Sequence, residues 1–392
     1  MSRITFVGLP FQGHNSGLGR VASALHARGH DVLLVFPQGA PDGPRLDGVR
    51  YEAANVTQAD VESGVESIAE LRDPERRARL LSEFLLGGLA HDIAFVTRAL
   101  HAERPDVVLC DPMSFSGAIG ATRAKVPWLA LATDFSMVSG YAEDDPFRQG
   151  VELFEPALRA ATSELSYDGE FRAALAVSPH LNLIPGAGEW FSPDGDVRFA
   201  PVGMAEPRPT GALTRKMPEA PLVLIVFGTV VQLESSFVRE LMEVGRHLPN
   251  VEFLVGARTD DEARFSSLPP NVQWQPFVPQ IRALQEASLV VHHGGANSFL
   301  ESVYFEVPQI ILPLHSDQFG SGALGERLGV ATALDTSSIS ASTLARHVAT
   351  ALSARAEPHA AARRRKAADE LRAVDYLDAV TRLTLSTARS RP

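Results

Sequence analysis

Short, apolar, β-branched runs alternate with helical segments along most of this chain, and this alternation restricts the fold more than any other feature. The first run, "ITFVGLP", is followed by "SGLGRVASALHARGH", which has helical spacing and a Gly stop, and then by a second run, "DVLLVFP". Residues 105–133 repeat the pattern with "PDVVLCD", "SGAIGATRAK" and "VPWLALAT". Strands that are apolar on both faces and separated by helices indicate an α/β fold with parallel sheets covered on both sides.

The alternation restarts in the second half of the chain, after a segment rich in Pro, Gly and charge, "PVGMAEPRPTGALTRKMPEAP". Such a composition is typical of a linker. For 392 residues, at about 150 residues per domain, we expect two domains with a cleft between them. We predict an N-terminal domain over 1–205, a linker over 206–220, a C-terminal domain over 221–372, and a C-terminal helix over 373–392 that packs back on the N-terminal domain.

Charge and composition argue against several classes of protein. The formal net charge is -11, whereas partners with a phosphate backbone favour a basic surface, so we expect no nucleic-acid partner. Hydrophobic residues make up 45% and charged residues 21% of the chain, as in a globular enzyme. The single cysteine, Cys110, permits no internal disulfide, and no apolar run is long enough for a signal or a membrane span. We expect a soluble, cytoplasmic protein with no membrane partner.

A pair of glycines follows the predicted strand "LVVHH". In open parallel sheets, ligands bind beyond the carboxyl ends of the strands. Because Gly294 and Gly295 lack Cβ atoms, their backbone N–H groups can approach an anion, and a helix that starts near Asn297 and Ser298 would favour a phosphate through its unpaired N–H groups and dipole. The alternative is a tight turn in which Asn297 or Ser298 only caps the helix.

The two adjacent histidines before the glycines do not predict a metal site. Neighbouring residues on a strand point to opposite sides, and no Cys, third His or carboxylate stands at ligand spacing. We expect one histidine to face the core and the other the loop. No Gly-Lys-Ser/Thr follows the glycines, and the first strand turn lacks a G-x-G-x-x-G motif, so a Walker loop and a nicotinamide enzyme are both disfavoured.

The stretch "HHGGANSFLESVYFEVPQIILPLHSDQ" resembles the signature of the family-1 nucleotide-sugar glycosyltransferases. The resemblance implies the GT-B architecture, in which two Rossmann-like domains with parallel sheets face a cleft. The matching residues stand at family-like separations: His293, Gly295, Asn297, Ser298, Glu301, Pro308, Pro313, Asp317 and Gln318.

The resemblance implies a donor site on the C-terminal domain. His293 and Ser298, with the glycine turn and the helix start at Gly294, Gly295 and Asn297, would hold the diphosphate. One turn further along the same helix, a glutamate would accept hydrogen bonds from ribose hydroxyls, and two residues after the next strand would bind the donated sugar. The glutamate is Glu301, and the two sugar-binding residues are Asp317 and Gln318.

Two further segments resemble parts of the family's donor site. "IVFGTVVQ" resembles the strand and turn that open the C-terminal domain, so Gly228 and Thr229 would face the diphosphate. In "PFVPQIRALQEA", Phe277 stands where the family usually has a Trp that stacks on the nucleobase, with Val278 supplying backbone contacts and Gln280 nearby. Phe277 is a departure from the pattern, and Trp274 is an alternative stacking residue.

Sugar transfer to a hydroxyl needs a base for the acceptor and stabilisation of the leaving diphosphate. "PFQGHNS" places His14 directly after the first strand, and in the family the His of a similar Gly-His pair is the general base. Asp111, after another strand, matches the family's partner Asp, which would fix the imidazole tautomer, and Asp134 is a weaker substitute. We expect a single displacement with inversion at the anomeric carbon, with no metal and no cofactor besides the nucleotide-sugar co-substrate.

The acceptor site is the least determined part of the sequence. Apolar side chains around residues 57–100 and 135–170 suit a hydrophobic natural-product acceptor, although their helical spacing also fits a core: Phe84, Met137, Tyr141 and Phe147. The donor base, UDP or TDP, and the sugar, a hexose or a deoxyhexose, stay open, as does the choice between monomer and homodimer. Two other functions are compatible with the same fold: a nucleotide-sugar epimerase, and a non-catalytic auxiliary protein that keeps the nucleotide site.

Overall fold

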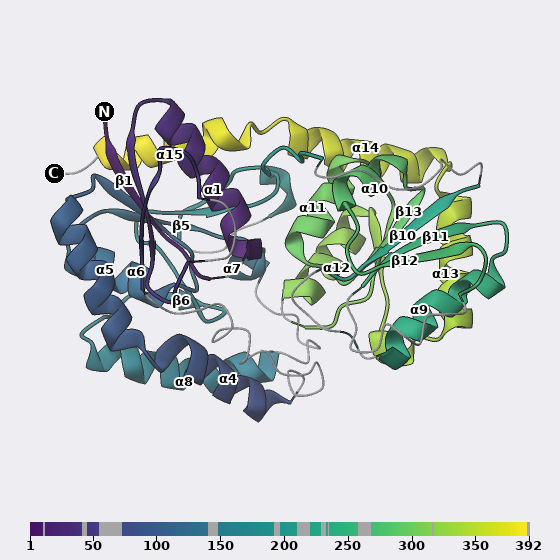
Figure 1. The fold of residues 1–392 in the computed structure, drawn as a ribbon, viewed down its shortest axis with the longest axis horizontal. Helices are drawn as coiled ribbons and strands as arrows, with labels where there is room; N and C mark the ends of the chain where they lie inside the picture. The colour runs from purple at the N-terminus through teal and green to yellow at the C-terminus, as the bar shows by residue number, and fades with distance from the viewer. Residues whose placement is uncertain are drawn as a thin grey trace. The chain divides into compact units, whose positions relative to one another are not determined.

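The computed structural model describes residues 1–10, 12–40, 45–54, 73–139, 148–191, 197–209, 220–228, 233, 235–257, 268–315 and 317–389. The chain divides into two compact units (Figure 1). The first contains Met1–Ala205 and Val374–Pro392, and the second contains Glu206–Ala373. Most of the predicted linker, 206–220, lies outside the described residues.

The first unit is built on a parallel seven-stranded sheet with the order β3-β2-β1-β4-β5-β8-β9. The register places Val7, at the end of β1, beside Val35 of β2 and Cys110 of β4. The carboxyl ends of β1, β4 and β5 therefore lie next to one another. The strands are β1 (Arg3–Val7), β2 (Asp31–Phe36), β3 (Arg50–Ala53), β4 (Val107–Cys110), β5 (Trp128–Leu131), β8 (Leu181–Ile184) and β9 (Phe199–Pro201).

Alternate residues of these strands enter two separate cores, one on each face of the sheet. Phe6 and Leu109 pack with α1 and α15, whereas Val7 and Val108 pack with α5, α6 and α8 (Figure 1). This division explains why the strands are apolar on both faces. The helices are α1 (Gln12–Ala27), α4 (Pro74–Leu86), α5 (Leu89–Glu103), α6 (Phe115–Arg123), α7 (Ser136–Ser139), α8 (Arg148–Glu164) and α15 (Tyr376–Arg389), with a 3₁₀ turn at Gly188–Trp190.

One helical stretch in the described part of the chain, Pro74–Glu103, is long and apolar enough to cross a membrane by length and composition alone. In the structure it is two helices, α4 and α5, which meet at Gly87 and Gly88. The first packs against α8 and the second against α6. A single stretch of this kind, interrupted and packed in this way, is weak evidence for a membrane span.

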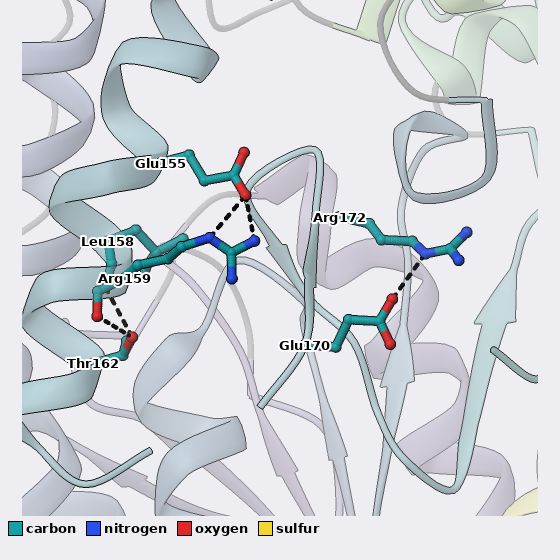
Figure 2. A network of polar contacts seen from close by, with 6 residues as sticks. All are labelled: Glu155, Leu158, Arg159, Thr162, Glu170 and Arg172. Carbon is teal, nitrogen blue, oxygen red and sulfur yellow. Dashed lines mark hydrogen bonds and ion pairs between the residues drawn. The ribbon is translucent and has the colours of Figure 1, made fainter. Parts of the chain in front are cut away.

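A small antiparallel hairpin lies beside α8, formed by β6 (Phe171–Arg172) and β7 (Leu175–Ala176) (Figure 2). Arg159 of α8 pairs with Glu155 at 2.5 Å and lies 5.9 Å from the centre of the Phe171 ring. Both turn residues, Ala173 and Ala174, have positive φ angles of 51° and 56°. Two-residue hairpin turns with this geometry usually contain Asn or Gly, so the Ala-Ala turn is strained and has no sequence signal.

The second unit contains a parallel six-stranded sheet with the order β12-β11-β10-β13-β14-β15. The strands are β10 (Leu222–Val226), β11 (Glu252–Gly256), β12 (Val272–Gln275), β13 (Leu289–His292), β14 (Gln309–Ile311) and β15 (Ala331–Ala333). The helices are α9 (Ser235–His247), α10 (Gln280–Glu286), α11 (Ala296–Tyr304), α12 (Asp317–Leu328), α13 (Ala341–Ala354) and α14 (Pro358–Arg372), with a 3₁₀ turn at Thr336–Ser338.

The Ala- and Arg-rich end of the chain forms two helices, which belong to different units. The first, α14, packs on α11 and α12 of the second unit. The second, α15, packs on α1 of the first unit, where the Tyr376 hydroxyl approaches Gly17 so closely that a Cβ at that glycine would lie 2.9 Å from it. The helix that carries His14 is thus supported by the end of the chain.

Candidate active site

His14 and Asp111 meet at the carboxyl edge of the first sheet. β1 ends at Val7, and His14 lies in the first turn of α1; Asp111 directly follows β4, the neighbour of β1. His14 Nδ1 lies 2.7 Å from Asp111 Oδ2. The His14 side chain is 25% exposed, whereas that of Asp111 is 2% exposed. The structure therefore brings together the two residues that the sequence nominates as base and partner.

Asp111 is held on both of its carboxylate oxygens. Oδ1 accepts a hydrogen bond from the backbone N–H of Met113 at 2.8 Å, while Oδ2 faces the imidazole of His14. A carboxylate on Nδ1 favours the tautomer with its proton on that nitrogen, which leaves Nε2 as the nitrogen that can accept a proton. The arrangement suits a histidine that acts as a general base.

Two residues after β5 lie close to this pair. Thr133 Oγ1 lies 3.4 Å from His14 Nδ1. Asp134 Oδ1 accepts a hydrogen bond from the backbone N–H of Ser136 at 2.7 Å, at the start of α7. Burial raises the pKa of the Asp134 carboxyl group, an effect that the Ser136 N–H and His14 oppose. Asp134 thus caps a helix, and Asp111 is the carboxylate that bonds His14.

The two adjacent histidines at the end of β13 have different surroundings, since His292 is buried and His293 is partly exposed. Their ring planes are 88° apart. His292 is 0% exposed, and its Nε2 lies 2.9 Å from Gln309 Oε1. Burial, with a smaller contribution from His293, lowers the pKa of His292 to about 3. His292 is therefore a neutral residue of the core.

The other ring, that of His293, lies against two glycines. A Cβ on Gly295 would be 2.6 Å from His293 Nε2, and one on Gly228 would be 3.2 Å from Cε1. Gly228 also has a φ of 72°, which favours glycine. Burial lowers the pKa of His293 to about 4, despite the Val226 carbonyl nearby. Burial thus favours the neutral form of the His293 ring in the absence of a ligand.

α11 begins at this corner without a side-chain cap. Its N-cap residue is Gly295, which makes no side-chain cap hydrogen bond to the first turn. Asn297 is exposed and Ser298 is buried within the helix, so neither residue plays the capping role that the sequence left open. Uncapped N–H groups and the helix dipole give this turn the properties of an anion site.

Gln280, at the start of α10, connects two of the predicted donor-binding residues. Its Nε2 donates to Ser298 Oγ at 3.1 Å and to Glu301 Oε2 at 2.6 Å. Ser298 and Glu301 are three residues apart on α11 and lie on one face of the helix. The carboxylate of Glu301 is therefore oriented by a neighbouring helix, a connection that the sequence alone did not indicate.

The predicted sugar-binding pair occupies the first two positions of α12. Asp317 is partly exposed, whereas Gln318 is buried. Gln318 Oε1 accepts hydrogen bonds from the backbone N–H groups of Leu314 and His315 at 2.8 and 3.1 Å. Gln318 thus braces the loop before α12, and Asp317 is the better placed of the two to meet a ligand.

The segment before α10 presents an aromatic ring to solvent. Phe277 is 62% exposed, whereas the next residue, Val278, is buried. Trp274 is partly buried, and its indole N–H donates to the carbonyl of Ala257 at 3.0 Å. An exposed phenyl ring that contributes little to the core is available for stacking, so Phe277 suits that role better than the anchored Trp274.

The predicted acceptor residues are only partly placed. Thr229 on the donor side, and Tyr141 and Phe147 on the acceptor side, lie outside the described residues. Met137 is 1% exposed and belongs to the core on the α5 side of the first sheet, so as the structure stands it offers no surface to an acceptor. Phe84 is partly buried against the same core. In the described part of the chain, no three His, Cys, Asp or Glu side chains gather as a metal site.

Known proteins resemble the whole chain in sequence and in fold. Residues 242–374 match the family described as the C-terminal domain of erythromycin biosynthesis protein CIII-like proteins. Demethyllactenocin mycarosyltransferase of Streptomyces fradiae is 30% identical over 338 residues, which cover 80% of this chain and 71% of the relative. Oleandomycin glycosyltransferase of Streptomyces antibioticus is 26% identical over 406 residues, covering 96% and 90%. The crystal structure of CalG4, the calicheamicin glycosyltransferase, covers 100% of both chains with a TM-score of 0.73 and 20% identity.

Proposed function

The chain belongs to the GT-B, family-1 glycosyltransferases of natural products and is itself a glycosyltransferase, and we propose a specific reaction for it. It moves a hexose or deoxyhexose from a UDP- or TDP-sugar to a hydroxyl group of a small, largely apolar natural product. The transfer inverts the configuration at the anomeric carbon. The observation that carries the proposal is the 2.7 Å contact between His14 Nδ1 and Asp111 Oδ2. Through this contact, Asp111 orients His14 as the base that a single displacement needs.

In this proposal, His14 acts through the ring nitrogen opposite Asp111. Nε2 takes the proton of the acceptor hydroxyl as its oxygen forms a bond to the anomeric carbon of the donor. The bond from that carbon to the diphosphate oxygen breaks in the same step, and the nucleoside diphosphate leaves with the electron pair. Asp111 stabilises the imidazolium that forms.

The negative charge of the leaving diphosphate would be balanced without a metal ion. The uncapped first turn of α11 offers backbone N–H groups and the positive end of a helix dipole. The His293 imidazole would add a polar group next to the phosphates; burial lowers its pKa to about 4. Gly228 and Gly295 allow the His293 ring to lie against the backbone here, because a Cβ at either position would come within 3.2 and 2.6 Å of the ring, respectively.

The nucleoside and the sugar would be recognised by the residues around this corner. Phe277 would stack on the base, with the backbone of Val278 beside it, and Glu301 would accept hydrogen bonds from the ribose. Gln280 supports this role because its bond at 2.6 Å orients the Glu301 carboxylate. Asp317 would bind sugar hydroxyls, while Gln318 keeps the loop in place.

We also propose the setting in which the enzyme works. Its partners would be the nucleotide sugar and the acceptor in the cytoplasm, with no nucleic acid, membrane or metal involved, and the protein would act as a monomer or homodimer. The acceptor would meet the first unit near partly buried apolar side chains such as Phe84. Two of the relatives are named for the compounds demethyllactenocin and oleandomycin, and these names support an antibiotic-like acceptor.

The test is an incubation of the protein with panels of UDP- and TDP-sugars and natural-product alcohols, read by the mass of the product. We expect an acceptor that gains one hexose or deoxyhexose, with the anomeric configuration, measured by NMR coupling constants, opposite to that of the donor. A product with retained configuration would contradict the single displacement. Samples without acceptor distinguish the other function on this fold, because an epimerase would change the nucleotide sugar by itself.

A further inference from the structure

The buried histidine of the pair, His292, lies at the centre of a hydrogen-bond network beneath the glycine turn. Its Nδ1 accepts a hydrogen bond from the backbone N–H of Gly294 at 3.1 Å. Its Nε2 lies 2.9 Å from the side-chain oxygen of Gln309, the first residue of β14. Its own carbonyl accepts from the N–H of Leu312 at 2.8 Å. One residue thus ties the turn to the neighbouring strand.

The partners of His292 fix its tautomer. A backbone N–H can only donate, so Nδ1 must be the unprotonated nitrogen. The proton is then on Nε2 and is donated to Gln309 Oε1. Burial keeps the ring neutral, since it lowers the pKa of His292 to about 3. The acceptor for Gly294 is therefore present at every pH at which the enzyme is expected to work.

The backbone conformation at Gly294 is tightly restricted. Gly294 has a φ of 95°, and a Cβ there would lie 2.8 Å from both the carbonyl oxygen of Gln318 and Cγ2 of Ile311. A side chain at this position would be strained, and the chain leads directly from it to Gly295, the N-cap of α11. The direction of the Gly294 peptide therefore determines where the first N–H groups of α11 and the ring of His293 lie.

We propose that His292 is a positioning residue for the donor diphosphate: by accepting the Gly294 N–H, it holds the glycine turn in the conformation that presents His293 and the first turn of α11 to the phosphates. The proposal rests on the donor site described above. His292 itself is 0% exposed and would not touch the ligand. Supporting residues of this kind keep binding groups in their productive geometry before the ligand arrives.

Two substitutions separate the two hydrogen bonds that the His292 ring makes. In H292N, the amide oxygen lies where Nδ1 lies and can accept the Gly294 N–H, while the bond to Gln309 is lost. In H292Q, the longer amide reaches toward Gln309, while the Gly294 N–H loses its acceptor. Both variants remove the imidazole and keep one of its two hydrogen bonds, so they are matched controls for each other. Gln309→Leu is a third variant, which removes only the partner of Nε2.

The readout is the dissociation constant of UDP and of TDP, measured by titration calorimetry, with the unfolding midpoint measured in parallel. We expect H292Q to weaken nucleoside diphosphate binding by about 10- to 100-fold, by analogy with the loss of residues that support the ligands of metal sites. H292N and Gln309→Leu should stay within about threefold of the wild type, the acceptor KM should not change, and all three variants should lose thermal stability. Equal binding by H292N and H292Q, whether weakened or not, would overturn the proposal.

A measurement on the wild-type protein keeps the proposal testable if H292Q does not fold. In hydrogen exchange, the Gly294 amide should be protected before any ligand is added, and UDP should add protection only to the first turn of α11. A Gly294 amide that exchanges freely in the absence of UDP would refute the positioning role. Failure of the wild type to bind either UDP or TDP would instead refute the proposed donor class, and the role of His292 with it.

Discussion

Replacement of Asp111 by asparagine should disable His14 without removing it. Asp111 Oδ1 accepts the Met113 N–H at 2.8 Å, and Oδ2 faces His14 Nδ1 at 2.7 Å. An asparagine would keep the Met113 bond with its only oxygen, and its amide NH₂ would then face His14. Two N–H groups cannot bond each other, so the imidazole would carry its proton on Nε2. The nitrogen that should accept the hydroxyl proton would already be protonated.

The loss can be estimated from this change of tautomer. In a Ser-His-Asp triad, the equivalent substitution leaves the geometry intact and lowers kcat by about 10⁴-fold. We expect a loss of about 10³- to 10⁴-fold in kcat here, or about 4–5.5 kcal/mol at about 1.4 kcal/mol per factor of ten. The KM for the donor should change little, because the donor site lies in the other unit.

The assay is the initial rate of product formation at saturating donor, with UDP binding measured separately as a test of the donor site. Asp134→Asn is the matched control, since Asp134 caps α7 through Ser136 and makes no hydrogen bond to His14 among those described. It should keep its rate within about tenfold of the wild type, in the range of an altered cap. A D111N variant within tenfold of the wild-type rate, or an Asp134→Asn variant that loses more, would refute this account of the base.

Further predictions concern the donor, pH and the hairpin. Phe277→Ala should weaken UDP binding by about 1–3 kcal/mol, as for a lost stacking partner, with an unchanged unfolding midpoint because the ring is 62% exposed; a calorimetric Kd within twofold of the wild type would contradict it. Burial lowers the pKa of His292 and of His293 from 6.5 to about 3 and about 4. Between pH 4 and pH 6.5, the unfolded chain therefore binds more protons than the native state. The free energy of unfolding should fall as pH is lowered from 6.5 toward 4. H292N should show a shallower loss in thermal melts, and a slope equal to that of the wild type would count against it. Ala174→Gly should stabilise the hairpin by about 1 kcal/mol because φ at this position is positive; Ala176→Gly, within β7, should destabilise in the same denaturant titration, and the opposite order would refute the strain.

Much of the fold was predictable because the apolar pattern of each strand shows which of its faces are buried. Residues such as Phe6 and Val7 are apolar although they face opposite sides of the sheet, and this pattern occurs only where helices cover both faces. The glycine turn was predictable from its position between a strand and a helix, although the sequence left open whether Asn297 or Ser298 caps that helix. The strand order could not be read locally, because it depends on which distant strands pair.

The parts that were not predicted depend on contacts between distant residues or on conformations without a sequence signal. His292 and Gln309 are on different strands, and Gln280 reaches Ser298 and Glu301 from another helix. The Ala-Ala turn of the β6–β7 hairpin lacks the glycine or asparagine that would identify it. Periodicity alone could not distinguish a pocket from a core, so Met137 was assigned to the acceptor site but lies within the core.

The most direct test of the central claim is a comparison of His14→Ala with the wild type in two measurements on the same preparation, sugar transfer and UDP binding. His14 belongs to the first unit, whereas the donor corner belongs to the second. We therefore expect transfer to fall below detection while the Kd for UDP stays within about twofold, because only the group that takes the acceptor proton is removed. Transfer at a rate near that of the wild type would contradict the role of His14 as the base.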